Sequence, residues 1–318
     1  MSSRSVRWWK LSEKSWQLRS KKKISVVGCI NRDTVIRPGS PTLHGYGGIL
    51  YNVFGLSALL GSGVEIVPMC NLGRDAAAPV LSLTSAYTNI LTDQIRVVAT
   101  RNNHCTMKYR RSGERSETFA GFVPSISYGQ LESALDSDIA LVNFISGRDV
   151  TLKTLKRFRE LFTEMIYLDF HTLSLGLREG GSRFLRRPEK WREYIECCDF
   201  LQMNAREFSL LSGKQPVESD IVGFYDSHVR LTGKALLVTL GKEGAAMVDV
   251  RRGRARVSFT RPSSLPTVID TTGAGDLFAA GFCAGLVSGE SLEACLKLAV
   301  KSGTQGCTII HPQDFAGR

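Results

Sequence analysis

Short apolar runs of about five residues recur along this chain, and a helical pattern follows almost every one of them. Runs rich in Val, Ile and Leu are typical of strands buried on both faces of a parallel sheet. The expected strands are Ile24–Cys29, Glu65–Met69, Ile139–Asn143, Met165–Asp169, Asp199–Met203 and Leu236–Leu240. The expected helices are Ile49–Leu60, Ala76–Ala86, Leu152–Phe162, Pro188–Cys197, Arg206–Leu211 and Ser219–Leu231. This order predicts an α/β fold with a doubly wound, mostly parallel sheet.

The pattern changes between Gln94 and Phe119, where polar and apolar residues alternate around a predicted turn at residues 112–114. Such alternation indicates strands with one wet face. We expect residues 94–119 and the first strands to form a small β lid on a single domain that spans residues 24–318. A Gly- and Pro-rich loop is expected between Cys29 and Ile49. Exposed lid strands can pair with a second copy of the chain, which would give a homodimer.

The formal net charge is +11, and most of it lies in the first 23 residues. Eight basic residues and one acid, Glu13, give this head +7 and leave +4 for the body. A concentrated basic head is typical of a solvated tail, so residues 1–23 are predicted to be a disordered extension. Their Ser and Arg content also resembles an organelle transit peptide, which is the less favoured alternative.

Neither membrane insertion nor a disulfide framework is expected. No stretch approaches the roughly 20 apolar residues that a membrane helix needs. The eight cysteines form no CxxC pair and no zinc-ligand spacing. Unpaired thiols in apolar surroundings fit a reducing compartment, so a cytoplasmic location is predicted.

The segment Val268–Phe282 carries the strongest functional signal. It runs from an apolar strand end through Asp-Thr-Thr-Gly-Ala-Gly-Asp into a helix of small and apolar residues. The two glycines let the backbone aim successive N–H groups at one point, and a helix N-terminus favours an anion there. Asp276 could then accept a proton from a hydroxyl while the N–H groups hold a phosphoryl group in transfer. The alternative is a plain helix start capped by Asp270 or Thr272.

The whole run from Asp270 to Asp276 resembles the C-terminal signature of ribokinase-like kinases, the PfkB family of carbohydrate kinases. The resemblance implies that Asp276 is the catalytic base that deprotonates the acceptor hydroxyl. The amides that form the hole for the phosphoryl group would be those of Gly273, Ala274 and Gly275.

Further motifs that resemble this family occur in the family's order. Gly28–Asp33 follows the first strand and resembles the first sugar-binding turn, in which the aspartate accepts substrate hydroxyls. An ordinary polar turn is the alternative. The di-glycine substrate motif comes next. It is followed by Ile49, Leu50 and Tyr51, at positions where relatives often have small residues. By this resemblance, substrate binding is assigned to Asn31, Asp33, Gly47, Gly48 and Asn52.

Two motifs in the C-terminal half resemble the nucleotide side of the family. Asn204 and Glu207 match an Asn-x-x-Glu near the phosphates, and they also read as a helix capping box. Thr239 and Gly241 match a Thr-x-Gly that lines the phosphates of ATP. The resemblance therefore implies ATP as a cofactor.

Two metal ions also follow from the resemblance. Glu207 would help to organise Mg²⁺, which keeps several waters and needs few protein oxygens. Asp270 and Thr272 match positions that help to bind a monovalent cation, K⁺, in some members.

The resemblance spans about Ile24 to Cys307 and implies an ATP-dependent kinase acting on a hydroxyl of a small carbohydrate or sugar derivative. A nucleoside kinase of the same superfamily would instead stack a base on aromatic side chains. Its candidates are Tyr51, Phe122, Phe144 and Phe170. A catalytically silent relative acting as a scaffold also stays open. Nucleic-acid binding through the tryptophans of the basic head is disfavoured, because such tails are usually solvated.

Overall fold

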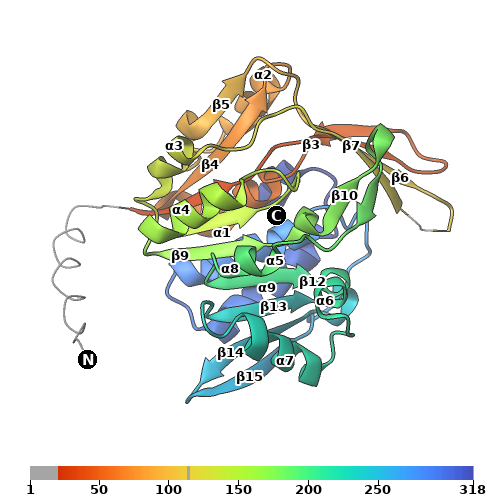
Figure 1. Cartoon of the computed structure of the whole chain (residues 1–318). Coiled ribbons are helices and arrows are strands. Elements are labelled where there is room, and N and C mark those ends of the chain that lie inside the picture. The colour runs from red at the N-terminus through yellow and green to blue at the C-terminus, as the bar shows by residue number, and fades with distance from the viewer. Residues whose placement is uncertain (1–20, 113–114, 318) are drawn as a thin grey trace.

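The computed structural model describes residues 21–112 and 115–317, and a nine-stranded sheet forms the centre of this part (Figure 1). In spatial order, the strands are β15 (Arg254–Thr260), β14 (Ala245–Arg251), β13 (Ala235–Thr239), β12 (Phe200–Asn204), β9 (Met165–Asp169), β8 (Ile139–Asn143), β1 (Lys22–Val27), β4 (Val64–Gly73) and β5 (Ile95–Val98). All neighbours from β13 to β5 pair in parallel, whereas β14 and β15 pair antiparallel at one edge. The predicted α/β class with a mostly parallel sheet is confirmed.

Helices cover both faces of this sheet, each face with its own apolar cluster. In β1, Ile24 and Val26 join one cluster and Val27 joins the other, as the alternation of a strand requires. The first face carries α1 (Leu50–Leu60), α2 (Ala77–Thr84), α8 (Ala274–Val287) and α9 (Leu292–Gly306). The second carries α3 (Tyr128–Leu131), α4 (Leu152–Leu161), α5 (Trp191–Ile195), α6 (Ala205–Ser212) and α7 (Glu218–His228). Burial on both faces explains why the strands are continuous apolar runs.

A smaller sheet stands beside the main one and forms the lid (Figure 1). Its order is β3 (Leu43–Tyr46), β2 (Arg32–Ile36), β6 (His104–Tyr109) and β7 (Arg115–Ala120). The buried side of this lid holds Val35, Cys105, Met107 and Phe119. A hairpin of β10 (Leu175–Leu177) and β11 (Arg183–Leu185) reaches β7 through a bridge between Ser182 and Thr118.

Two expectations need correction, and one element was not predicted. The Gly- and Pro-rich segment after Cys29, expected to be a loop, supplies the lid strands β2 and β3. The segment 94–119 is not wholly in the lid, because β5 pairs with β4 and its Ile95 packs into the core of the main sheet. The hairpin of β10 and β11 was not predicted. Its strands have only three residues each, too few to show a period.

The first strand, expected from Ile24, begins two residues earlier, since Lys22 already lies in β1 and Lys23 pairs with Asp136. The rest of the basic head, residues 1–20, falls outside the described residues. Across the described chain, no helix is long and apolar enough to cross a membrane. The eight cysteines are free, and seven of them are buried. A cytoplasmic location and a homodimer through the lid stay predictions.

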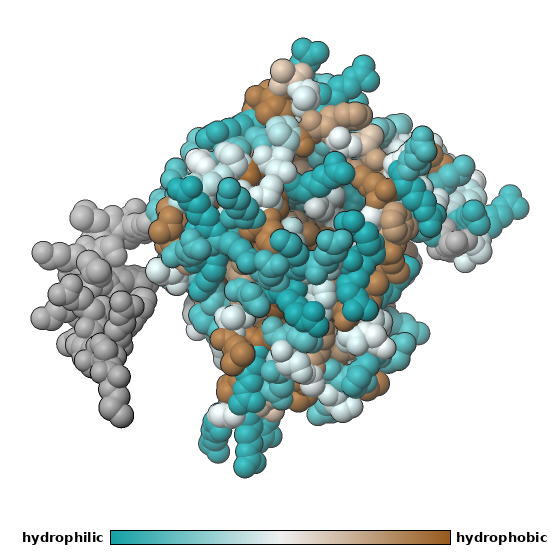
Figure 2. Space-filling model, in the orientation of Figure 1, coloured by the Kyte–Doolittle hydropathy of each residue, from teal (hydrophilic) through white to brown (hydrophobic). Residues whose placement is uncertain are grey.

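Hydrophilic side chains predominate on the face shown in Figure 2, with hydrophobic ones in small groups among them. Three exposed hydrophobic residues stand close together in one loop before α8: Leu265, Val268 and Ile269, which are 64%, 58% and 50% exposed. Apolar side chains left open in one loop can be covered by a ligand.

Candidate active site

The Gly-rich turn that begins α8 has the backbone that an anion site needs. Gly273 is the N-cap residue with φ +79°, a conformation that favours glycine. Its Cα also lies against the ring of Tyr51, so a Cβ would overlap that ring. Within the described residues, no side chain caps this helix, so the predicted alternative of a helix start capped by Asp270 or Thr272 is not found. The first amides of α8 are therefore not closed off by a side chain.

Asp276 lies in the first turn of α8 and is 6% exposed. Asn143 Nδ2 donates to Asp276 Oδ1 at 2.7 Å, and Asn52 Nδ2 donates to the Asp276 backbone oxygen at 2.8 Å. Burial raises the pKa of Asp276, while the charge of His171 and the hydrogen bond from Asn143 oppose the rise. A carboxylate that is held in place and holds its proton more tightly than usual suits a general base.

Asn143 and Asp169 were not among the predicted site residues, although both face this centre. Each is the last residue of its strand, β8 or β9, at the carboxyl edge where ligands bind in such sheets. In the sequence, a polar residue at the end of an apolar run could therefore have indicated a site residue at this edge of the sheet. His171, two residues after β9, has φ +36° and a buried Nδ1 with no hydrogen-bond partner among the described residues.

A buried relay fixes the backbone beside Asp276. Gln202 Nε2 donates to Asp169 Oδ2 at 2.9 Å and to the Gly275 backbone oxygen at 3.1 Å. Tyr167 donates its hydroxyl hydrogen to Gln202 Oε1 at 2.5 Å. Burial raises the pKa of Asp169 well above its usual range, and the charges of Glu207 and Asp276 add to the rise. The site thus gathers three buried acids at the end of the sheet.

Asn204 and Glu207 form the capping box that the sequence allowed. The Asn204 side chain accepts from the backbone N–H of Glu207, and the Glu207 carboxylate accepts from the Asn204 backbone N–H at 2.9 Å and from Asn204 Nδ2 at 2.6 Å. Burial raises the pKa of Glu207 to about 8, and the bonds from Asn204 oppose that rise. The cap holds the carboxylate in the interior, where it could help to hold a cation.

Replacing Glu207 with Gln should reduce the pH dependence of stability in the metal-free protein. The folded-state pKa of about 8 lies above the usual value, so the folded protein binds more protons than the unfolded chain between about pH 4.5 and 8. Stability therefore falls as pH rises through that window, by at most roughly 1.4 kcal/mol per pH unit for one group. Melting temperatures measured with a chelator should fall less steeply in Glu207→Gln than in wild type. The surface variant Glu218→Gln should keep the wild-type slope, and an unchanged slope in Glu207→Gln would contradict the prediction.

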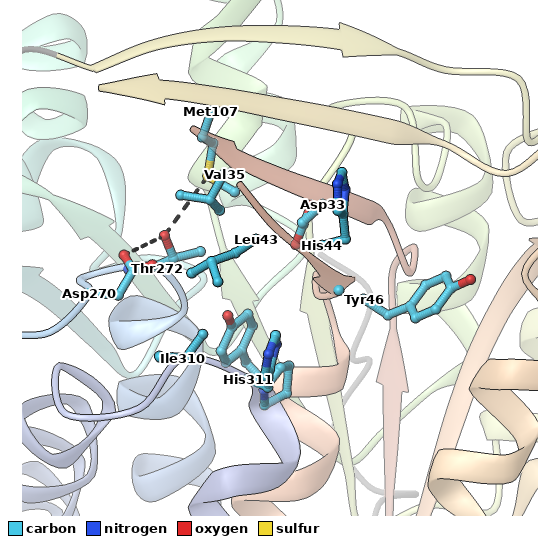
Figure 3. A pocket seen from close by; sticks show the side chains of 13 residues that line it. Asp33, Val35, Leu43, His44, Tyr46, Met107, Asp270, Thr272, Ile310 and His311 are labelled. Carbon is cyan, nitrogen blue, oxygen red and sulfur yellow. Dashed lines mark hydrogen bonds between the residues drawn. The ribbon is translucent and has the colours of Figure 1, made fainter. Parts of the chain in front are cut away.

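The acceptor side is built around Asp33 in β2 (Figure 3). A Cβ on Gly47 would overlap Asp33 Oδ2, and Gly48 has φ +68° with its Cα against the Cys29 carbonyl. The di-glycine turn is therefore required for the backbone to approach Asp33. Burial raises the pKa of Asp33 well above its usual range, and the charges of Glu117, Asp276 and Asp270 contribute.

Asp33 lines a cavity between the lid and the C-terminal segment, together with Tyr51 and His311 (Figure 3). The cavity has a volume of only 20 Å³, room for about one water. A larger ligand can therefore enter this cavity only if the side chains that line it move.

The remaining predicted acceptor residues support the site instead of facing this cavity. The Asn31 side chain accepts from the Cys29 thiol, and its carbonyl holds the Gly47 N–H at 3.0 Å. Asn52 is fully buried, donates to the Asp276 backbone and accepts from Asn143 Nδ2 at 2.9 Å. Both residues therefore fix the backbone at Gly47 and Asp276.

A second cavity of 280 Å³ runs from Thr239 and Gly241 past Gly275 to α9. Its walls are mostly apolar and include Leu265 and Val268 from the exposed loop. The lining brings together the predicted phosphate-side residues Thr239, Gly241, Ala274 and Gly275. The loop before α8 borders both cavities, since Asp270 and Thr272 line the first and Thr271 lines the second.

Asp270 and Thr272, the residues expected at a monovalent cation, are bound to each other. Thr272 donates from its backbone N–H at 2.9 Å and its hydroxyl at 2.8 Å to Asp270 Oδ1. The second oxygen, Oδ2, forms an ion pair with Arg37 of the lid at 2.6 Å. A carboxylate with both oxygens engaged and its charge matched does not fit a bound K⁺.

The model of the family described as pfkB family carbohydrate kinase matches residues 170–312. A cytidine kinase from Thermococcus kodakarensis is 25% identical over 282 residues, which cover 87% of this chain and 92% of the relative. Arabidopsis thaliana ribokinase, solved with ribose and ATP, has a TM-score of 0.73 and 21% identity over 93% of this chain and 96% of its own. A pyrophosphate-dependent kinase in the ribokinase family has a TM-score of 0.74 and 17% identity over 91% and 97%. The two structures show that the chain has their fold.

Proposed function

Because this chain belongs to the PfkB family of carbohydrate kinases, we propose that it transfers the γ-phosphoryl group of ATP to a hydroxyl of a small carbohydrate or sugar derivative. Asp276 is the proposed general base. The observation that carries the proposal is the position of its carboxylate, which is buried in the first turn of α8 beside an uncapped Gly-Ala-Gly turn and held by Asn143.

The proposed mechanism relies on positioning and charge. Asp33 accepts hydrogen bonds from acceptor hydroxyls, and Asp276 takes the proton of the reacting hydroxyl. The amides of the turn hold the phosphoryl group as it moves in line. Closure of the lid excludes water, which limits ATP hydrolysis.

The cavity beside Thr239 supports a nucleotide as donor. An apolar cleft of 280 Å³ flanked by Leu265, Val268 and Phe278 suits a purine base. The neighbour that uses pyrophosphate shows that the fold accepts another donor. A pyrophosphate donor has no base to cover these side chains, so the cleft favours ATP here.

Glu207 and Asp169 are the residues that would hold Mg²⁺, directly or through water. Both are buried and their carboxylates repel each other without a cation beside them, which fits a metal that arrives with the nucleotide. Mg²⁺ would neutralise charge on the transferred phosphoryl group.

A nucleoside acceptor is the second candidate, because the cytidine kinase is similar over nearly the whole chain. Of the aromatic side chains predicted to stack a base, Phe144 and Phe170 are fully buried in the core. Phe122 lines a hollow with Arg32, on the opposite face of β2 from Asp33. Only Tyr51 of those four predicted rings lies at the acceptor cavity, which favours a sugar. Comparing kcat/KM across sugars, sugar acids, sugar phosphates and nucleosides tests the choice, and a nucleoside preference would contradict it.

With the best acceptor from that panel, Asp33→Ala should raise KM for the acceptor and lower kcat/KM by about 10- to 100-fold, the cost of a lost charged hydrogen bond. KM for ATP should stay unchanged, because Asp33 does not line the nucleotide cavity. Steady-state kinetics with both substrates varied check this, with Asp226→Ala on the surface of α7 as the control. An unchanged acceptor KM would remove Asp33 from the acceptor site.

A further inference from the structure

Arg37, the residue that follows β2 in the lid, reaches across to the loop before α8. Its Nη2 lies 2.6 Å from Asp270 Oδ2, and the Asp270 side chain is only 4% exposed. The Arg37 guanidinium also lies over the ring of Tyr109 in β6, 4.8 Å from its centroid. Arg37 is therefore fixed on one side by the lid and on the other by Asp270.

A second contact joins the same two segments. The Thr272 hydroxyl donates to Asp270 Oδ1 and lies 3.8 Å from the sulfur of Met107 in β6 (Figure 3). The loop 270–272 leads directly into Gly273, whose amide begins the turn beside Asp276. The ion pair thus ties the lid to the backbone that would hold the phosphoryl group.

The charge of Asp270 needs a partner, because a buried carboxylate without one is strongly disfavoured. A monovalent cation was expected to supply that charge, but the guanidinium of Arg37 already does so. Arginine keeps its charge at every working pH and forms directed bonds to a carboxylate.

We propose that Arg37 is the positioning residue of the anion hole: a cation built into the lid that takes the place of a bound K⁺ and makes the reaction independent of monovalent cations. The proposal rests on the proposed function, since it assumes that the turn after Thr272 holds the transferred group. It adds that the hole is complete only when the lid is closed.

The test compares kcat in KCl, NaCl and tetramethylammonium chloride at equal ionic strength. The kcat of the wild-type protein should differ among these salts by no more than about twofold. In Arg37→Met, kcat should fall by roughly 10- to 100-fold, as for groups that support a site from behind, and K⁺ should restore part of it where tetramethylammonium does not. Arg37→Lys should keep most of kcat. Arg230→Met, which removes an exposed arginine paired with Asp226 on α7, is the control and should behave as wild type.

A wild-type enzyme that needs K⁺ would overturn the proposal, as would an unchanged kcat in Arg37→Met. A loss that neither K⁺ nor Arg37→Lys repairs would also overturn it, because Arg37 would then be only structural. Melting temperatures in the same salts give a readout without catalysis. K⁺ should stabilise Arg37→Met and not wild type, and specific stabilisation of wild type by K⁺ would contradict the inference. If wild type shows no transfer in any salt, the proposed function fails while the melting data still decide the role of Arg37.

Discussion

Asp276→Asn should lower kcat by at least about 100-fold, and by as much as 10⁴-fold, while the protein stays folded and binds ATP. The amide has nearly the shape of the carboxylate, so the hydrogen bond with Asn143 can be kept by a flip of one amide. An amide cannot take the proton of the acceptor hydroxyl. Steady-state kinetics give kcat, and calorimetric titration with ATP gives the binding constant.

The matched control is Asn143→Ala, which removes the hydrogen bond to Asp276 but leaves the base in place. That hydrogen bond lowers the pKa of Asp276, so its loss should raise the pKa further and move the acid limb of the kcat/KM profile to higher pH. Activity should be recovered as pH is raised in Asn143→Ala and not in Asp276→Asn. Near wild-type turnover by Asp276→Asn would show that another group is the base.

Gly273→Ala should cost both stability and catalysis. The residue has φ +79°, which costs a non-glycine residue about 1–3 kcal/mol, and its new methyl group would overlap the Tyr51 ring. The backbone must shift, which moves the amides out of line, and kcat should fall by roughly 100-fold or more. Thermal unfolding and kinetics of the same preparation measure the two effects.

Gly275→Ala tests whether Gly275, unlike Gly273, is needed for ligand binding and not for the backbone conformation of the turn. Its φ is not in the left-handed region, and a Cβ there would meet its nearest neighbour, Gln202 Nε2, at an ordinary 3.7 Å. The melting temperature should therefore stay near that of wild type, while a methyl group in the lining of the proposed nucleotide cavity weakens ATP binding. Equal destabilisation by both variants would contradict the distinction.

The main sheet was predictable because its strands are buried on both faces and stand out as apolar runs. Strands β8 and β9 have the predicted bounds, and Leu50–Leu60 differs from its prediction by one residue. The lid strands β2 and β3 were hidden, because their four or five residues lie among turn residues and because β2 also pairs with β6, far along the chain. Pairing of that kind depends on tertiary contacts and leaves little local pattern.

The site residues also fall into two groups, those that the sequence could predict and those that it could not. The backbone turn at Gly273 and the carboxylate of Asp276 could be named from a continuous motif, whereas Asn143 lies 133 positions from Asp276 in the sequence. Arg37 could not be found either, because its partner Asp270 lies on another element and a lone arginine in a loop carries no signal. Side chains that orient a reactive group from a distant segment emerge only when the chain is folded.

The most direct measurement is the transfer of the γ-phosphoryl group itself. Purified protein would be mixed with γ-labelled ATP, Mg²⁺ and the acceptor panel, and labelled products would be separated from ATP and phosphate. We predict a labelled phosphate ester with one acceptor class in wild type, formed in step with ADP, and none with Asp276→Asn. Label that appears only as free phosphate, or a labelled ester that Asp276→Asn makes at the wild-type rate, would contradict the assignment of Asp276 as the base of a kinase.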